Sequence, residues 1–207
     1  YRENDQLGGH DPYSASKAAA EIVFSAYARS FLVARPTLGA ATARAGNVIG
    51  GGDWALDRLV PDCIRAWATQ NTIEIRSPFA TRPWQHVLEP LSGYLLLGVE
   101  LSEDIKLHGE AYNFGPTANQ SYSVSQLINE MTKFWNNAKW VDTSESLNRF
   151  HEAGLLKLNC DKALYDLSWT PTLQFDETVK VTVEWYKHFY QDQNKSMYEF
   201  TASQIED

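Results

Sequence analysis

Short apolar stretches with strand character alternate along this chain with segments that repeat at the helical period. The sequence predicts a helix from Pro12 to near Phe31, a buried strand within 38–46, an apolar helix over 86–102 and a strand over 111–115. Strands that alternate with helices are typical of an α/β fold, because a helix returns the chain to the start of the next parallel strand. The alternation argues against an all-helical or an all-β fold.

Further elements follow from the same patterns. The sequence predicts helices over 58–69, 123–135, 161–169 and 176–190, and strands over 72–76 and 155–159. Ser123 is the expected N-cap of the second of these helices, with Gln126 at the spacing of a capping box. Asn159 or Asp161 is the expected cap of the third. The polar residues 191–207 are expected to form a C-terminal tail.

The charge and the cysteines exclude several classes of partner and site. The net charge is −8 and no run of Lys or Arg occurs, which argues against a nucleic-acid or anionic membrane surface. Cys63 and Cys160 lie far apart and show no metal-ligand spacing, so a reduced protein of the cytoplasm is expected. His86 and Glu89 share a predicted helix face but have no evident third ligand, so no metal site is expected.

Tyr13 and Lys17 lie one helical turn apart in DPYSASKAAAE, so both side chains share one face of the first helix. The unperturbed pKa of a tyrosine is about 10. A nearby ammonium favours the phenolate and so lowers this pKa. Such a tyrosine can take a proton from a sugar hydroxyl while hydride leaves the same carbon. The alternative is a surface pair, because a chain with ten tyrosines often matches this spacing by chance.

The context of this pair resembles the active-site helix of the extended short-chain dehydrogenase/reductase superfamily. The resemblance continues in order through RAGNVIGGGDW (44–54), DRLVPDCIRAW (57–67), TRPWQHVLEP (81–90), AYNFGP (111–116) and KLNCDKALYDLSWTP (157–171). The stretches RAGNVIGGGDWA with the following DRL and PD (44–62), and RPWQHVLEPLSGY (82–94), are more specific than the tyrosine–lysine spacing. They resemble the CDP-glucose 4,6-dehydratase family within that superfamily.

The resemblance implies an NAD-dependent conversion of CDP-glucose to CDP-4-keto-6-deoxyglucose, a step of deoxysugar biosynthesis. Tyr13 would be the base, and Lys17 would also hold the nicotinamide ribose. The implied fold is the C-terminal part of a Rossmann-like doubly wound parallel sheet plus a smaller α/β substrate-binding domain. Residues 1–50 would end the NAD-binding domain, and 51–190 would mainly bind the sugar nucleotide, with some segments returning to the sheet. A homodimer through the Tyr13 helix is also implied.

Five residues are candidates for binding the nucleotide sugar. Arg82 can offer a planar fork to a pyrophosphate, and Asn47 offers an amide beside a glycine-rich loop. The resemblance places both on phosphate, Asn113 near the nucleotide and His151 near the phosphates, while Arg58 heads a predicted helix near the loop. The alternatives are an arginine that covers an aromatic face, a turn asparagine and a hydrogen-bonded structural histidine.

A dinucleotide-binding domain of this superfamily opens with a strand, a glycine-rich turn and a helix, and the chain has no G-x-x-G-x-x-G. The superfamily's Thr or Ser of the proton relay and the adjacent Asp–Lys pair precede the tyrosine by some tens of residues. Only twelve residues precede Tyr13, so we expect the C-terminal part of a longer dehydratase. A 4-epimerase, a dehydratase for another nucleotide and a non-catalytic sugar-nucleotide-binding fragment stay open as alternatives. The tryptophan and the tyrosines of 185–190 are expected to form the core and edge of the last helix and not a stacking platform.

Overall fold

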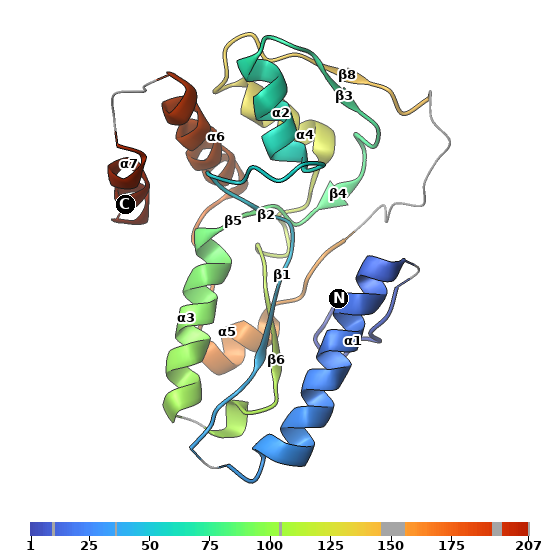
Figure 1. The fold of residues 1–207 in the computed structure, drawn as a ribbon, viewed down its shortest axis with the longest axis vertical. Helices are drawn as coiled ribbons and strands as arrows, with labels where there is room; N and C mark the ends of the chain where they lie inside the picture. Colours follow the sequence, from blue (N-terminus) through green and yellow to red (C-terminus); the bar gives the residue numbers. More distant parts are fainter. Residues whose placement is uncertain (10, 36, 104, 146–155, 192–195, 207) are drawn as a thin grey trace. The chain divides into compact units, whose positions relative to one another are not determined.

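The structure is a computed structural model that describes residues 1–9, 11–35, 37–103, 105–145, 156–191 and 196–206. Two compact units divide the chain, and each is built from three separate stretches (Figure 1). The first unit comprises Tyr1–Ala45, Glu89–Thr117 and Leu158–Pro171, and the second comprises Gly46–Leu88, Ala118–Lys157 and Thr172–Asp207. Strands and helices alternate in both, so the expected α/β class is confirmed.

The first unit is built around one pair of parallel strands, β1 (Thr42–Ala45) and β6 (Ala111–Phe114), in register from end to end. The helices α1 (Pro12–Tyr27) and α3 (Leu88–Glu103) run alongside this pair (Figure 1). The short helix α5 (Asp161–Leu167) contacts β6. A 3₁₀ turn over Ile105–Leu107 follows α3.

The start of α1 is well capped. Asp11 is its N-cap and accepts hydrogen bonds from the backbone N and the Oγ of Ser14 at 2.9 and 2.7 Å, and these bonds lower the pKa of the Asp11 carboxyl. Pro12 suits the first turn because its missing N–H would have no partner there. The helix continues into a π-helical turn over Ala28–Leu32, so the expected end near Phe31 is confirmed.

The core of the first unit is mainly aromatic and aliphatic. Its buried members are Leu97, Leu107, Tyr112, Phe114, Ala163, Leu167 and Trp169. A Cβ at Gly93 would lie 2.3 Å from the Phe114 ring, so only glycine lets α3 pack this closely against β6. The indole N–H of Trp169 donates to the Oγ of Ser92 at 3.0 Å, which satisfies a polar group inside this packing.

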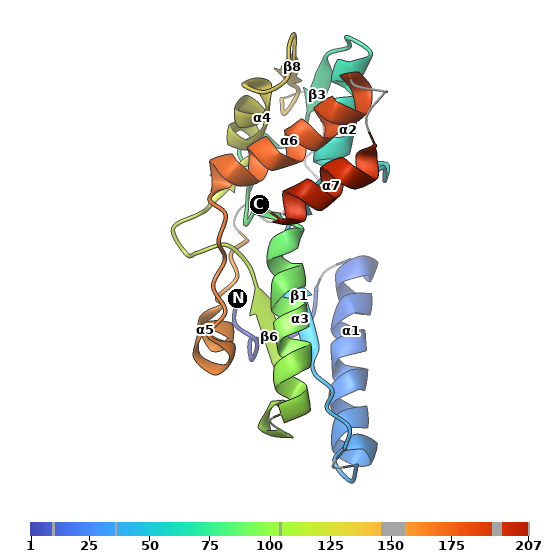
Figure 2. The ribbon, with the colours of Figure 1, turned by 90° about the vertical axis from the view of Figure 1, so that its left-hand side faces the viewer.

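The described residues of the second unit form three short strand pairs and four helices. The pairs are β2 (Val48–Ile49) with β5 (Gln85–His86), β3 (Ile73–Ile75) with β8 (Trp140–Asp142), both parallel, and β4 (Thr81–Arg82) with β7 (Tyr122–Ser123), antiparallel. The helices are α2 (Leu59–Ala68), α4 (Val124–Thr132), α6 (Phe175–Gln191) and α7 (Met197–Glu206). Helices α6 and α7 lie side by side (Figure 2).

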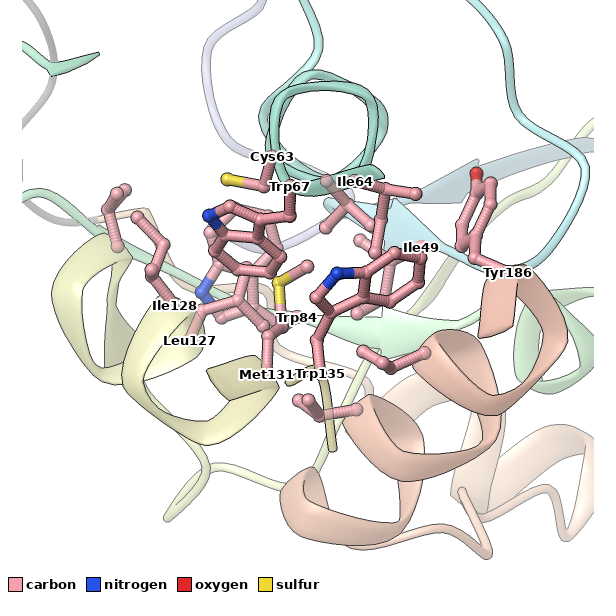
Figure 3. Packing of buried hydrophobic residues seen from close by; sticks show 14 of the residues in the cluster. Ile49, Cys63, Ile64, Trp67, Trp84, Leu127, Ile128, Met131, Trp135 and Tyr186 are labelled. Carbon is pink, nitrogen blue, oxygen red and sulfur yellow. The ribbon is translucent and has the colours of Figure 1, made fainter. Parts of the chain in front are cut away.

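Helices α2, α4 and α6 enclose the core of the second unit, in which Trp67, Trp84 and Trp135 are buried together (Figure 3). Burying a large apolar side chain is worth about 1.5–3 kcal/mol, so each of these tryptophans stabilises the unit. The capping box at the start of α4 is present: Gln126 N donates to Ser123 Oγ at 3.2 Å, and Ser123 N donates to Gln126 Oε1 at 2.8 Å.

Four expectations about local structure were wrong. The helix expected over 86–102 begins at Leu88, and His86 lies on strand β5 and shares no helix face with Glu89. The expected strand over 155–159 is absent from its described part, 156–159, where the Asn159 N–H donates to the carbonyl of Tyr1 without forming a ladder. Cys160, and not Asn159 or Asp161, occupies the N-cap position of α5. The described part of the expected tail, 191 and 196–206, is mostly helical: Gln191 ends α6, and α7 forms because α6 offers it aromatic partners.

The boundary between the units at residues 45 and 46 lies near the boundary expected at residue 50. The assignment of NAD binding to one part and sugar-nucleotide binding to the other stays a prediction.

Candidate functional site

Helix α1 presents Tyr13 and Lys17 on one face, as the spacing predicts. The Lys17 Nζ lies 5.7 Å from the centroid of the Tyr13 ring, within the range of a cation–π contact. Tyr13 is 71% exposed, so its hydroxyl is accessible to a small molecule. The contact joins the ammonium to the face of the ring, and the catalytic role of the pair stays a prediction.

A half-buried ion pair between Arg44 and Glu21 holds α1 against β1. Arg44 donates from Nε and Nη2 to the two carboxylate oxygens of Glu21, both at 2.9 Å, and Thr42 Oγ1 donates to Glu21 Oε2 at 2.9 Å. The bond from Arg44 lowers the pKa of Glu21 more than any other influence. Glu21 lies two helical turns after Tyr13, so this fork fixes the height of the tyrosine along the strand. Sequence reasoning did not single out these three residues.

Asn113 is almost completely buried in β6, at 1% exposure. Its Nδ2 donates to the carbonyls of Tyr1 and Asn159 at 3.3 and 3.2 Å, and its backbone N donates to Glu3 Oε1 at 2.9 Å. These bonds tie the first residues of the chain to β6. The Oδ1 of Asn113 has no hydrogen-bond partner among the described residues. The expected role near the nucleotide is untested and stays a prediction.

Arg82 lies on β4, opposite Tyr122 of β7. Its Nη1 donates to the carbonyl of Thr81 at 2.8 Å, and the side chain is half-buried. The adjacent Trp84 is buried and its indole N–H donates to the carbonyl of Tyr122 at 3.1 Å. The strand pairing and the tryptophan therefore anchor the backbone that carries the arginine.

Asn47 immediately precedes β2, and its carbonyl accepts a hydrogen bond from Gln85 N at 3.1 Å. This bond extends the β2–β5 pair, so Asn47 and the Arg82 segment are joined within the second unit. The side chain of Asn47 is half-buried. Its interpretation as a phosphate ligand stays a prediction.

Arg58 occupies the N-cap position of α2, and its side chain is 63% exposed. Its Nε lies 3.8 Å from Asp53 Oδ2, a distance typical of a weak, solvated ion pair. The guanidinium is therefore accessible to an anion, with Asp53 as its neighbour on the loop. His151 lies outside the described residues.

His86 on β5 is buried, at 3% exposure, although it was considered only as a metal ligand in the sequence. Its Nδ1 accepts a hydrogen bond from Leu88 N at 3.4 Å, and its Nε2 has no partner among the described residues. Burial lowers the pKa of His86 from 6.5 to about 4. The imidazole is therefore neutral in the folded protein near pH 7.

We expect His86 to make the protein sensitive to acid. The unfolded imidazole titrates near 6.5 and the folded one near 4, so the unfolded state binds the proton first as the pH falls. Unfolding should become easier by up to about 3 kcal/mol between these two pH values. Urea titrations of the wild type and His86→Gln from pH 7 to pH 4 measure this loss. An equally steep loss in both proteins would show that His86 is not its source.

The part of the chain that the structure describes contains neither a candidate metal site nor a candidate membrane-spanning helix. No group of three or more His, Cys, Asp or Glu side chains there could hold a metal ion. No helix within the same residues has the length and apolar character needed to cross a membrane.

Comparison with known proteins identifies the family. The sequence profile of GDP-mannose 4,6 dehydratase matches residues 1–182. The chain belongs to this family. A CDP-glucose 4,6-dehydratase of Salmonella typhimurium is 44% identical to this family member over 192 residues, which is 90% of this chain. The chain spans 53% of the length of that relative.

Solved structures of dehydratases and epimerases share the fold of this family member. A dTDP-glucose 4,6-dehydratase from Bacillus anthracis in complex with NAD matches 90% of this chain and 55% of its own, with a TM-score of 0.71 and 21% identity. A UDP-glucose-4-epimerase from Stenotrophomonas maltophila with bound NAD matches 91% of this chain and 58% of its own, with a TM-score of 0.74 and 17% identity. The expected Rossmann-like class is thereby confirmed, and these likenesses show the fold alone.

Proposed function

We propose that this chain belongs to an NAD-dependent nucleotide-sugar 4,6-dehydratase that converts CDP-glucose to CDP-4-keto-6-deoxyglucose and water. The observation that carries the proposal is the accessible Tyr13 with the Lys17 ammonium beside its ring on α1. The 44% identity to a CDP-glucose 4,6-dehydratase supports the choice of substrate.

In this proposal Tyr13 removes the proton of the sugar C4 hydroxyl. Lys17, one turn further along α1, places its ammonium beside the ring of this tyrosine. The two side chains also fit NAD, because the exposed ammonium and hydroxyl of one helix face can both meet a ribose hydroxyl. NAD, when bound, supplies the hydride acceptor and donor for the reaction. Its pyrophosphate would need a glycine-rich turn, and no G-x-x-G-x-x-G occurs in these 207 residues.

Side chains of the second unit bind the nucleotide diphosphate in this proposal. Arg82 and Arg58 supply charged donors, and Asn47 supplies an amide. The exposed guanidinium of Arg58 supports its part in the proposal, since a diphosphate can reach it from solvent. Asn113 is proposed as a contact near the nucleotide, and His151 as a contact near its phosphates.

A 4-epimerase is the second candidate, because it shares the oxidation at C4 and the epimerase structure shares this fold. Incubation of the whole protein with CDP-glucose separates the two by mass spectrometry. A dehydratase gives a product lighter by one water, and an epimerase gives a product of unchanged mass. A whole protein that leaves CDP-glucose unaltered while converting another nucleotide sugar would overturn the choice of substrate.

We further propose a homodimer formed through α1. Ile22, Val23 and Tyr27 are exposed apolar residues on this helix, and Ala19 and Ala26 let a second helix approach closely. We expect the whole protein to sediment as a dimer at micromolar concentration and Val23→Glu to sediment as a monomer. A wild-type monomer would contradict the dimer, and an unchanged dimer in Val23→Glu would place the interface elsewhere.

The location in the cytoplasm is part of the same proposal. Cys63 and Cys160 are both free thiols, as expected for a protein in a reducing compartment. Burial raises the pKa of Cys63 to about 12 and that of Cys160 to about 11, so both thiols are protonated at neutral pH.

A further inference from the structure

The glycine-rich loop 50–58 packs against aromatic residues at the end of α6. Trp54 contacts four rings of this helix, at centroid distances of 4.9 to 6.2 Å, from Trp185, Tyr186, Phe189 and Tyr190. Trp54 is an exposed loop residue. The sequence predicted Trp and Tyr of 185–190 to form the core and edge of the helix, and Trp54 contacts all three of them. We call Trp54, Trp185 and Tyr186 the aromatic clamp.

The glycines of the loop are required by the clamp. A Cβ at Gly51 would lie 2.0 Å from Cγ of Trp185, so any side chain there would displace the indole. Gly52 has a φ of +80° and lies against the same ring, with its Cβ position 3.5 Å from the indole. The sequence G-G at these positions is therefore fitted to Trp185.

Helix α7 holds the clamp from the other side. The indole N–H of Trp185 donates to Thr201 Oγ1 at 2.8 Å, and Phe200 stacks on His188 with centroids 4.1 Å apart. Gln204 Nε2 donates to the carbonyl of Val181 at 3.0 Å. The family match ends at residue 182, so most of this helix pair lies beyond what the family profile describes.

Within the clamp, Tyr186 is hydrogen-bonded to the backbone of the loop. It lies at one side of the core cluster, with its hydroxyl pointing away from the α6 ribbon (Figure 3). This hydroxyl donates to the carbonyl of Asp53 at 2.7 Å. Burial raises the pKa of Tyr186 to about 12, so the hydroxyl remains a donor at neutral pH.

Asp53 contacts both Tyr186, through its backbone carbonyl, and Arg58, through its carboxylate. One carboxylate oxygen of Asp53 accepts from Ala55 N at 3.0 Å, and the other lies 3.8 Å from Arg58 Nε. Arg65 closes the loop from α2, because its guanidinium donates to the carbonyls of Trp54 and Ala55, both at 3.0 Å. Asp53 therefore connects the Tyr186 hydroxyl with the exposed guanidinium of Arg58.

We propose that Tyr186 and Trp185 are positioning residues for Arg58, so that the α6–α7 pair sets the affinity of the loop for the diphosphate of the nucleotide sugar. The proposal rests on the proposed function, because the anion is the diphosphate of CDP-glucose. The clamp acts through Asp53 and touches no substrate. It changes how well Arg58 is preorganised and leaves the chemistry at the sugar unchanged.

The test uses the whole protein and measures CDP affinity by calorimetry together with KM and kcat for CDP-glucose. Tyr186→Phe keeps the ring packing and removes only the hydrogen bond to Asp53. We expect it to weaken CDP binding and raise KM by about three- to tenfold, the scale of one hydrogen bond, with kcat unchanged. Thr201→Val, which removes the acceptor of the Trp185 indole, should act in the same direction. Tyr198→Phe removes a hydroxyl from the exposed side of α7 and is the matched control.

The decisive readout is the coupling to Arg58. In an Arg58→Ala background, Tyr186→Phe should change CDP affinity by less than twofold, since the group that it positions is gone. Full additivity of the two substitutions, or CDP affinity and KM unchanged in both Tyr186→Phe and Thr201→Val, would overturn the proposal. A wild type that binds no CDP would overturn it together with the proposed function. A wild type that binds CDP in a Tyr186-dependent way without turnover would overturn the proposed reaction alone.

Discussion

Replacing Tyr13 with Phe in the whole protein is expected to lower kcat for CDP-glucose by about 10²–10⁴, the usual contribution of a positioned general base. The phenyl ring keeps its place over the Lys17 ammonium, and only the ionisable oxygen is lost. Because Tyr13 is exposed at the first turn of α1, the substitution should leave folding unchanged. Steady-state turnover measured with CDP affinity separates the loss of chemistry from a loss of binding.

Tyr27→Phe is the matched control for this experiment. It removes a hydroxyl from another exposed tyrosine of α1, whose ring packs on Phe31 at a centroid distance of 4.8 Å. We expect its turnover to equal that of the wild type. Near wild-type turnover by Tyr13→Phe would remove the base from the mechanism, and the tyrosine–lysine pair would then be a surface feature of the helix.

Arg82→Ala is expected to weaken CDP binding by about 1.5–3 kcal/mol, the scale of a hydrogen bond to a charged group. Arg82→Lys should recover part of this loss, because an ammonium keeps the charge but not the planar fork. Arg76→Ala removes an exposed arginine from the same unit and serves as the control. Calorimetry with CDP measures all three variants.

The position of Arg82 on β4 makes a stability measurement necessary beside the calorimetry. Its Nη1 bonds the Thr81 carbonyl, so Arg82→Ala can also loosen the β4–β7 pair. A variant that melts at the wild-type temperature and binds CDP weakly supports the diphosphate contact. Equal CDP affinity of Arg82→Ala and the wild type would contradict it and leave the arginine a packing residue.

Features governed by neighbouring residues could be predicted from the sequence. The capping box of Ser123 and Gln126 forms because both partners lie within one helical turn. The shared face of Tyr13 and Lys17 follows from helical geometry in the same way. The α/β class follows from the alternation of periods along the whole chain, which needs no knowledge of packing.

Features that depend on distant residues could not be predicted in this way. Tyr186 and Asp53 are joined by a hydrogen bond across 133 positions, and no local pattern marks either partner. Arg44 and Glu21 pair across 23 positions, and their pairing could not be predicted for the same reason. The helix α7 forms in a polar stretch because aromatic rings of α6 stabilise it, so a reading of that stretch by itself suggests a tail.

The fate of the hydrogen at C4 tests the dehydratase assignment most directly. We would incubate the whole protein with CDP-glucose that carries deuterium at C4 and locate the label in the product by NMR. A 4,6-dehydratase returns to C6 the hydride that it removes from C4, so the account predicts deuterium in the C6 methyl group of a 4-keto product. Deuterium retained at C4 of an epimeric sugar would contradict the account and establish a 4-epimerase.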